Sequence, residues 1–466
     1  MKLFNSITQN QERLNPVNKN KINMYVCGPT VYNYFHIGNA RVFVFFDVVR
    51  RYLEHRNYNV NYVQNFTDID DKLIEKSNEI GVTVSELAEN MIEAYFKDAR
   101  ALGVKDADFH PKATEHINDM IDAISRLIEK GLAYETDKDV YFDTTKFPEY
   151  GKLSGQDISK LQSGSRIEVD PYKKNPLDFV LWKKAKPKEP SWDSPWGKGR
   201  PGWHIECTAM SRKYLGDTLD IHAGGEDLAF PHHENEVAQS EGLTGKLFTR
   251  HWMHARFLQI ESKKMGKSLG NQLMVRDLLQ KHPPLALRFF LLSAHYRNPL
   301  NYTEELLQSA KSSVERLNTA YKNLKYALDE CAVQNQSKEY SDNKQIEEYK
   351  NKFYRAMDND FNTADAISVM FEVVKEVNNY LALPSRDYVE LKNFKETLDN
   401  FDSIMGLIER VEQKSLDREI EVLIEKRQQA RSNKDFATAD KIRDELLQRG
   451  ITLEDTPHGV RWKYIE

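Results

Sequence analysis

Residues 22–66 read INMYVCGPTVYNYFHIGNARVFVFFDVVRRYLEHRNYNVNYVQNF, and this stretch decides the fold class of the chain. Ile22–Val26 and Val60–Phe66 are apolar runs typical of strands, and Gly38–His55 has apolar residues at a helical period of about 3.6. A strand, a helix and a second strand form a βαβ unit, which begins a parallel sheet of the Rossmann type. The stretch therefore predicts an α/β fold.

The loop between the first strand and the helix contains His36, Gly38 and Asn39. Backbone N–H groups at a helix start, with the helix dipole behind them, form a ready site for phosphate. The His36 imidazole could donate to the same anion. A plain N-terminal helix cap is the other interpretation, and these residues alone leave both open.

Two later stretches, GRPGWHIECTAMS at 199–211 and FPHHENE at 230–236, contain residue types that bind metals. Pro231 suits the first turn of a helix, so His232 and Glu236, four residues apart, are expected on one helix face. Taken alone, this pattern is better explained as an exposed His/Glu pair.

Two cysteines change that interpretation. Cys27 ends the first strand, where open α/β sheets place ligands, and Cys207 lies in the first of the two later stretches. Two thiolates, an imidazole and a carboxylate suit zinc better than magnesium or calcium. The candidate ligands are Cys27, Cys207, His232 and Glu236, although a buried structural cysteine beside an exposed pair remains the alternative.

Composition excludes several classes of protein. The 466 residues are 40% hydrophobic and 29% charged, which is typical of a soluble globular protein, and no run is long enough to cross a bilayer. The first fifteen residues lack the apolar core of a secretion signal. Three scattered cysteines favour a reducing cytoplasm. Because the net charge is −5, any RNA must bind a local basic surface.

Beyond the βαβ unit, the pattern predicts amphipathic helices at Thr83–Leu102 and Thr114–Lys130. Leu132–Arg200 is richer in Pro, Gly, Trp and Lys, so we interpret it as an insertion in the sheet domain. Short strands are expected within it at Asp139–Phe142 and Asp178–Trp182.

The second half begins with a predicted returning strand at Thr218–His222 and a loop at Ala223–Asp227, whose two glycines allow close approach to a ligand. Lys263–Ser268 forms a basic loop that could contact phosphates. Leu278–Met405 is nearly all helical, interrupted by an expected polar loop at Asp329–Lys344.

The tail is predicted to be a separate module. Leu416–Asn433 and Phe436–Gln448 have the pattern of charged helices, and Ile451–Leu453 with Val460–Tyr464 has that of a hairpin. Cys331, in the polar tract before the tail, is expected to be an incidental thiol.

Taken in order, the motifs resemble those of the cysteinyl-tRNA synthetases, a family of class I aminoacyl-tRNA synthetases, over nearly the whole chain. The matching stretches are YVCGPTVYNYFHIGNAR, NFTDIDDKLI, GRPGWHIECTAMS, FPHHENE, KKMGKSLGN, DNDFNTADAI and DTPHGVRW. The resemblance implies cysteine–tRNA ligase activity: cysteine and ATP give cysteinyl adenylate, and the cysteinyl group then passes to the terminal adenosine of cysteine tRNA.

The resemblance also assigns the nucleotide site. It places His36–Asn39 at the HIGH signature and Lys264–Ser268 at the KMSKS signature. It implies catalytic roles for His36, Lys264 and Lys267, with a magnesium ion carried by ATP. The residues implied in ATP binding are His36, Gly38, Asn39 and Lys267.

Three positions depart from the family pattern. Asn39 replaces the usual second histidine of HIGH, Gly266 replaces the first serine of KMSKS, and Ala223 stands where glycine is frequent. The nucleotide contact at Asn39 would therefore come from an amide.

For the metal, the resemblance implies one zinc per chain, held by Cys27, Cys207, His232 and Glu236. It would select cysteine over serine, because zinc lowers a thiol pKa and bonds a thiolate far better than a hydroxyl. Glu236 is expected to be the ligand most easily loosened. Trp203 could close over the amino acid, with a buried core tryptophan as the alternative.

The expected architecture is a Rossmann-like catalytic domain with an insertion, a helical bundle and a small mixed α/β C-terminal domain. The bundle and tail would bind tRNA, the tail reading the anticodon, and a cytoplasmic monomer is expected. The expected segments are 1–131 and 201–250 (catalytic, the latter with the zinc site), 132–200 (insertion), 251–308 (KMSKS loop and stem contact), 309–405 (bundle) and 406–466 (anticodon-binding).

Two rival functions fit part of this pattern. A related ligase would couple activated cysteine to the amine of a small amino sugar, but it needs no anticodon tail. A catalytically inactive RNA-binding protein with a structural zinc would not need to retain His36 and Lys267.

Overall fold

The computed structural model divides into two compact units, Met1–Ile408 and Glu409–Glu466. None of the described helices is long and apolar enough to cross a membrane. The described residues are 1–156, 170–187, 189–261, 263–264, 273–333, 344–409, 415–449, 451–456 and 459–464.

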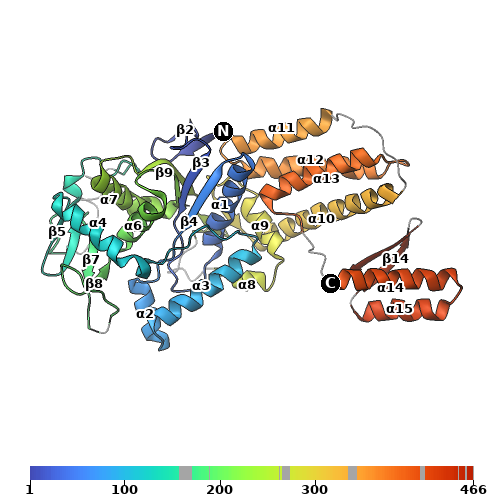
Figure 1. Ribbon diagram of the computed structural model, residues 1–466, viewed down its shortest axis with the longest axis horizontal. Coiled ribbons are helices and arrows are strands. Elements are labelled where there is room, and N and C mark those ends of the chain that lie inside the picture. The colour runs from blue at the N-terminus through green and yellow to red at the C-terminus, as the bar shows by residue number, and fades with distance from the viewer. Residues whose placement is uncertain are drawn as a thin grey trace. The chain divides into compact units, whose positions relative to one another are not determined.

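A four-stranded parallel sheet with strand order β10-β9-β3-β4 organises the first unit (Figure 1). Its strands are β3 (Lys21–Val26), β4 (Asn59–Gln64), β9 (Leu219–Gly225) and β10 (Thr249–Ala255). From β3 the chain continues to β4 on one side, and β9 pairs with the other side of β3. The order thus reverses between β3 and β9, where open α/β sheets bind ligands. The predicted α/β fold class is confirmed.

The alternation of side chains along β3 decides what each face of the sheet contacts. Met24 packs in the same cluster as helix α1 (Ile37–His55). Cys27, just past the strand end, instead packs with Cys207 of helix α6 (Trp203–Leu215). The two faces of the sheet are therefore covered by different helices, and Cys27 belongs to the α6 side.

Helices on either flank confirm the predicted pattern. Thr83 caps helix α3 through a reciprocal hydrogen-bonded box with Glu86, and the second predicted helix begins with a 3₁₀ turn at Ala113–His116. The remaining elements of this region are β1 (Lys2–Asn5), β2 (Asn10–Arg13), α2 (Asp71–Ile80), α3 (Val84–Ala101), α4 (Ile117–Glu129) and α7 (Glu234–Thr244).

The segment interpreted as an insertion forms its own antiparallel sheet, in the order β5-β6-β7-β8. Its core includes Phe142, Leu181 and Trp182, which pack in one cluster with residues of α4 and α6. Both predicted strands are present. The strands are β5 (Ala133–Glu135), β6 (Asp139–Phe142), β7 (Phe179–Lys184) and β8 (Gly199–Pro201).

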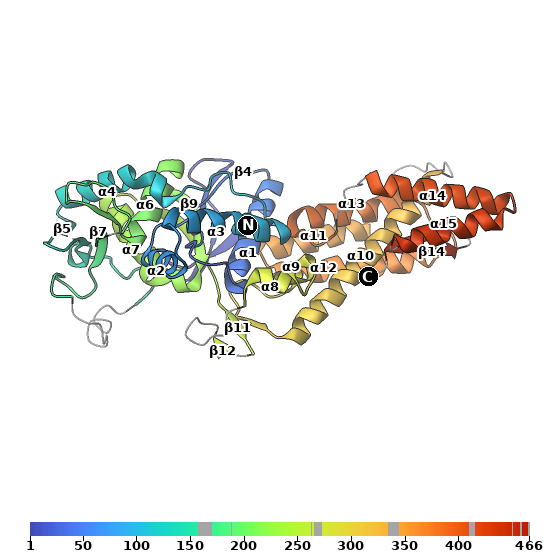
Figure 2. The ribbon, with the colours of Figure 1, turned by 90° about the horizontal axis from the view of Figure 1, so that it is seen from below.

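A three-stranded sheet, β12-β11-β13, follows the parallel sheet. β11 pairs antiparallel with β12 and parallel with β13, and Figure 2 shows the β11–β12 hairpin. The elements are β11 (Leu258–Ile260), β12 (Lys263–Lys264), α8 (Val275–Leu279), α9 (Pro284–Leu292) and β13 (Leu300–Tyr302).

Four helices form the bundle, α10 (Glu304–Val333), α11 (Lys344–Asp358), α12 (Thr363–Leu381) and α13 (Tyr388–Met405), and they lie side by side (Figures 1 and 2). The polar loop predicted from Asp329 is wrong at its start, because α10 continues to Val333. Leu328 and Cys331 pack against the core cluster and so favour helix over loop there.

The second unit has the predicted pair of helices and hairpin. Ile424, Ile442, Leu446 and Ile451 form its small core. Its elements are α14 (Ser415–Ser432), α15 (Phe436–Gln448), β14 (Ile451–Thr456) and β15 (Gly459–Tyr464).

Candidate active site

The four predicted metal ligands meet in one buried group beyond the carboxyl end of β3. Cys27 follows β3, Cys207 lies on α6, and His232 and Glu236 lie before and within α7. One ligand atom from each lies within 4.8 Å of the others, and all four residues are buried. The alternative of an exposed His/Glu pair is therefore wrong.

The expectation that Pro231 lies in the first turn of a helix is confirmed, because Phe230 is the one residue of Ala229–His233 with non-helical backbone angles. Phe230 is extended, with φ −138° and ψ 131°, because a residue before proline disfavours the helical region. A wide turn spans Ala229–His233, and α7 begins at Glu234. His232 and Glu236 therefore lie on one helix face, four residues apart, and their side chains contact each other as expected.

Distances within the group suit a single ion. The Sγ atoms of Cys27 and Cys207 are 3.9 Å apart, and Cys27 Sγ is 3.7 Å from Glu236 Oε1. His232 Nε2 is 3.0 Å from the same carboxylate oxygen. Zinc bonds of about 2.0–2.3 Å in a tetrahedron place neighbouring ligand atoms roughly 3.3–3.8 Å apart. The residues present therefore fit zinc with small adjustments.

Charge in the group also suits a cation. A hydrogen bond with Cys27 lowers the pKa of Cys207 to about 6. Burial opposes ionisation of Glu236, but His222 and His232 lower its pKa to about 2. Burial also opposes charging of His232, yet Glu236 and Cys207 raise its pKa to about 10. A thiolate and a carboxylate thus surround one cationic imidazole, whose proton a divalent metal would displace.

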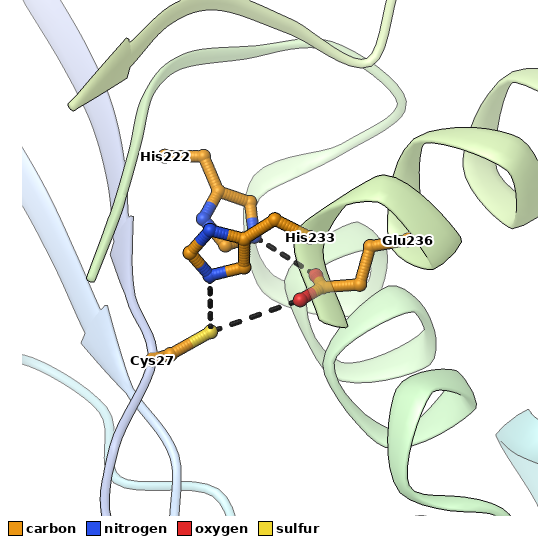
Figure 3. A group of neighbouring side chains, drawn as sticks. All are labelled: Cys27, His222, His233 and Glu236. Carbon is orange, nitrogen blue, oxygen red and sulfur yellow. Dashed lines mark hydrogen bonds and ion pairs between the residues drawn. The ribbon is translucent and has the colours of Figure 1, made fainter. Parts of the chain in front are cut away.

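Two histidines that the sequence analysis did not single out complete the surroundings (Figure 3). His222 Nε2 lies 2.9 Å from Glu236 Oε2, and His233 Nε2 lies 3.2 Å from Cys27 Sγ. One ligand atom from each of Cys27, His222, His233 and Glu236 also lies within 4.8 Å of the others. Because this group shares Cys27 and Glu236 with the first, its two histidines suit outer partners that orient the ligands.

The loop predicted at Ala223–Asp227 is largely strand. Ala223, Gly224 and Gly225 pair with β10, and only Glu226 and Asp227 leave the sheet. A Cβ on Gly224 would lie 3.0 Å from the His233 ring. The close approach allowed by this glycine is therefore made by His233.

Trp203 lies at the first position of α6 and is 39% exposed, so it is not a core residue. Its ring centroid is 4.3 Å from that of His232. An aromatic side chain thus lies against one predicted metal ligand and remains open to solvent.

His36 and Asn39 form a capping box at the start of α1, in which each side chain accepts a hydrogen bond from the other residue's backbone N–H. His36 Nδ1 accepts from the Asn39 backbone N–H at 3.2 Å, and Asn39 Oδ1 accepts from the His36 N–H at 3.4 Å. Burial lowers the pKa of His36, opposed by Asp227, which favours a neutral ring. Since Nδ1 is an acceptor, the ring proton is on Nε2. The cap interpretation is confirmed, and it leaves one imidazole donor for another partner.

The second signature lies mostly outside the described residues. Lys264 is in β12, paired with Gln259 of β11, and Lys267 is not described. On the other side of that gap, Ile37 N–H donates to Leu273 O at 2.9 Å. The segment after the second signature is therefore hydrogen-bonded to the start of α1.

Comparisons with known proteins define the class. Residues 13–312 match the catalytic domain of class I (C) tRNA synthetases. A methionyl-tRNA synthetase from Mycobacterium tuberculosis, in complex with methionyl-adenylate, shares the fold with a TM-score of 0.60 at 14% identity, covering 83% of this chain and 90% of that one. A LeuRS from Agrobacterium radiobacter, in a ternary complex, also has a TM-score of 0.60, at 11% identity, covering 84% of this chain and 85% of that one. The fold and the matching domain are those of a class I aminoacyl-tRNA synthetase.

Closer relatives and the remaining domains define the family. Residues 352–409 match the DALR domain, and 413–462 match the cysteinyl-tRNA ligase anticodon binding domain. Cysteine–tRNA ligases from Geobacillus thermodenitrificans and Anoxybacillus flavithermus are each 54% identical, over 99% of this chain and 99% of the relative. The chain belongs to the cysteine–tRNA ligase family.

Proposed function

We propose that this chain activates L-cysteine with ATP and transfers the cysteinyl group to the 3′-terminal adenosine of cysteine tRNA. The observation that carries the proposal is the buried group of Cys27, Cys207, His232 and Glu236 at the switch point of the sheet. Two sulfur ligands suit a soft metal, and a soft metal binds the thiol of cysteine better than the hydroxyl of serine.

These four residues would hold zinc, one ion per chain. When bound, zinc supplies a soft Lewis acid that prefers a thiolate to a hydroxyl, whereas shape alone would separate cysteine from serine by only about 10²-fold. His222 and His233 would orient the Glu236 carboxylate and the Cys27 thiolate through their hydrogen bonds. Trp203, partly exposed at the start of α6, would cover the amino acid and exclude water.

Activation needs a polarised α-phosphate more than an acid or base. In-line attack by the substrate carboxylate requires alignment and stabilisation of charge on phosphate oxygens. The N-terminus of α1, with Gly38 and Asn39 in its first turn, would provide backbone donors. His36 would donate from Nε2, the nitrogen left free by its capping bond.

Charge that develops on the departing pyrophosphate would be stabilised by Lys264 and Lys267, with magnesium carried by ATP. Both lysines are assigned by the resemblance to the KMSKS signature. Lys264 lies in β12, which pairs with β11, and Lys267 follows three residues later. The proposal assigns no residue as a general base.

Transfer would involve the bundle and the second unit, with the latter reading the anticodon. The match of residues 413–462 to an anticodon binding domain supports this division. We further propose a monomer in the cytoplasm, because one chain provides all four candidate ligands and its cysteines are free thiols.

The activation step is tested by amino-acid-dependent exchange of labelled pyrophosphate into ATP. We expect exchange with cysteine and at least about 10²-fold less with serine at equal concentration, because a hydroxyl cannot replace the thiolate. Comparable rates with both amino acids would contradict the proposed role of the buried group.

Removal of the second unit separates activation from transfer. Without Glu409–Glu466, we expect tRNA charging to fall about 5- to 150-fold for each tRNA base that no longer stacks on the protein, since stacking on an aromatic side chain is worth about 1–3 kcal/mol per base. Pyrophosphate exchange should stay within about twofold of the full chain. Both activities are measured on the same preparation, and equal losses in the two assays would count against an anticodon-reading role.

A further inference from the structure

Arg41 is a buried cation that the activation chemistry above does not use. It lies in the first half of α1, two residues after Asn39, and is 1% exposed. A guanidinium carries five N–H donors in a fixed planar fork and cannot act as an acceptor. Burying such a charge is costly unless its donors are satisfied.

Four of the five Arg41 N–H donors reach backbone carbonyls, from two separate segments, whereas the buried Nε has no hydrogen-bond partner among the described residues. Arg41 Nη1 donates to the carbonyl oxygens of Arg256 and Phe257, at 2.8 and 3.2 Å. Nη2 donates to those of His295 and Asn298, at 3.2 and 2.6 Å. Burial lowers the pKa of Arg41 to about 10, opposed by the Glu226 carboxylate. The side chain therefore remains cationic at neutral pH and acts as a bridge between backbones.

Both segments lead into the small sheet. Phe257 immediately precedes β11, and Asn298 lies two residues before β13, its parallel partner. β11 continues through β12 to Lys264, at the start of the second signature. The Arg41 side chain thus hydrogen-bonds the residues just before two paired strands, β11 and β13. We call these residues the strand entrances.

The chain leaving the second signature is fastened to the same helix start. Ile37 N–H donates to Leu273 O at 2.9 Å, and Val275 N–H donates to Phe35 O at 3.1 Å. Arg41 therefore attaches to α1 the chain that leads into the second signature. Backbone hydrogen bonds attach the chain that follows the signature to the start of the same helix.

We propose that Arg41 is a positioning residue for amino-acid activation: by clamping the entrances of β11 and β13 to α1, it fixes the separation between the His36 phosphate site and strand β12. The proposal rests on the proposed function, because the distance matters only if both signatures act on ATP. Arg41 itself need not touch the nucleotide.

Lysine cannot replace this fork. Its ammonium has three donors at one point, whereas the four carbonyls lie in pairs at the two ends of a planar group. Arg41→Lys keeps the charge and no longer reaches both segments at once. Because displacement of about 1 Å can cost about 10²-fold in rate, kcat for cysteine-dependent pyrophosphate exchange should fall by about that factor. KM for cysteine and zinc content should not change.

Arg288→Lys is the matched control. Arg288 on α9 is fully buried and donates to the carbonyls of Leu102 and Met405 and to the Asp47 carboxylate, without contacting either strand entrance. Arg288→Lys shows how much the loss of a buried guanidinium lowers Tm in general. We expect it to retain near-normal kcat even where its Tm falls as far as that of Arg41→Lys.

Hydrogen exchange provides a readout independent of activity. In Arg41→Lys, amides of Leu258–Ile260 and Leu300–Tyr302 should exchange faster, while those of β3 and β4 stay protected; Arg288→Lys should leave the two short strands unchanged. Arg41→Gln serves as a second variant if Arg41→Lys does not fold, with the same expected pattern.

Normal kcat in Arg41→Lys, or the same loss in Arg288→Lys at equal Tm, would overturn the positioning role. Unchanged exchange in β11 and β13 would overturn the clamp itself. Failure of the proposed function is distinguishable from both, because it would appear as absent cysteine-dependent exchange in the unsubstituted chain, where hydrogen exchange still reports the clamp.

Discussion

Cys207→Ser is expected to abolish tight zinc binding and, with it, most cysteine activation. The substitution replaces a sulfur whose pKa is lowered to about 6 with a hydroxyl that stays protonated at neutral pH. It also leaves only Cys27, His232 and Glu236 of the four candidate ligands. Loss of an outer partner alone costs about 10–100-fold in metal affinity, so loss of a direct ligand should cost at least about 10²-fold.

Zinc content by elemental analysis and cysteine binding by calorimetry measure this effect separately. Cys331→Ser is the matched control, because Cys331 lies on α10 in the bundle, where its Sγ is 3.9 Å from the Arg386 carbonyl oxygen. It should retain both zinc and cysteine binding. Normal cysteine binding in Cys207→Ser would refute the assignment of the group as the site that selects the thiol.

His36→Asn is expected to reduce the rate of activation while leaving the fold intact. Asparagine is a favourable N-cap, so its side chain can accept the Asn39 N–H as His36 Nδ1 does. The Nε2 donor is lost, since the shorter amide does not reach as far. Removing one donor to developing charge typically costs about 10²–10³-fold in kcat.

Steady-state pyrophosphate exchange gives kcat and the KM for cysteine, and a thermal scan gives Tm. We expect a large loss of kcat with little change in KM or Tm. Thr83→Asn makes a comparable cap exchange at α3, a helix that contributes none of the candidate site residues, and should leave all three values nearly unchanged. If His36→Asn keeps normal kcat, the imidazole serves only as a cap.

Local pattern predicted the parallel-sheet region well, because its signals are strong. The apolar strand before Cys27, the period of α1 and the cap at Thr83 each follow from short-range physics. The meeting of Cys27, Cys207, His232 and Glu236 was predicted from residue types and from Cys27 ending a strand that open sheets use for ligands, and their role as ligands stays a prediction.

Features that depend on contacts between distant segments were not predictable. The pairing of Ala223–Gly225 with β10 turns an expected loop into strand, and core packing extends α10 beyond Asp329. The roles of His222 and His233 follow from their distances to Glu236 and Cys27. The doubled histidine beside His232 was the only available signal for His233.

Arg41 shows the same limit more clearly. In sequence it is one arginine in a helix with several, and its partners are backbone carbonyls more than two hundred residues away. Carbonyls leave no trace in residue type, so no pattern could indicate them.

The rival acceptors differ in their use of the second unit. A ligase that couples cysteine to a small amine has no need for residues 413–462, which match an anticodon binding domain. A catalytically inactive RNA-binding protein with a structural zinc would hold the same buried ligand group. Cysteine-dependent pyrophosphate exchange distinguishes it from a ligase.

Transfer of labelled cysteine to total bacterial tRNA tests the central claim most directly. Periodate-treated tRNA, which lacks an intact terminal ribose, provides the blank, and excess serine is the competitor. We predict incorporation into intact tRNA only, unaffected by serine. Absence of incorporation alongside normal cysteine-dependent pyrophosphate exchange would contradict the claim and make the acceptor a small amine.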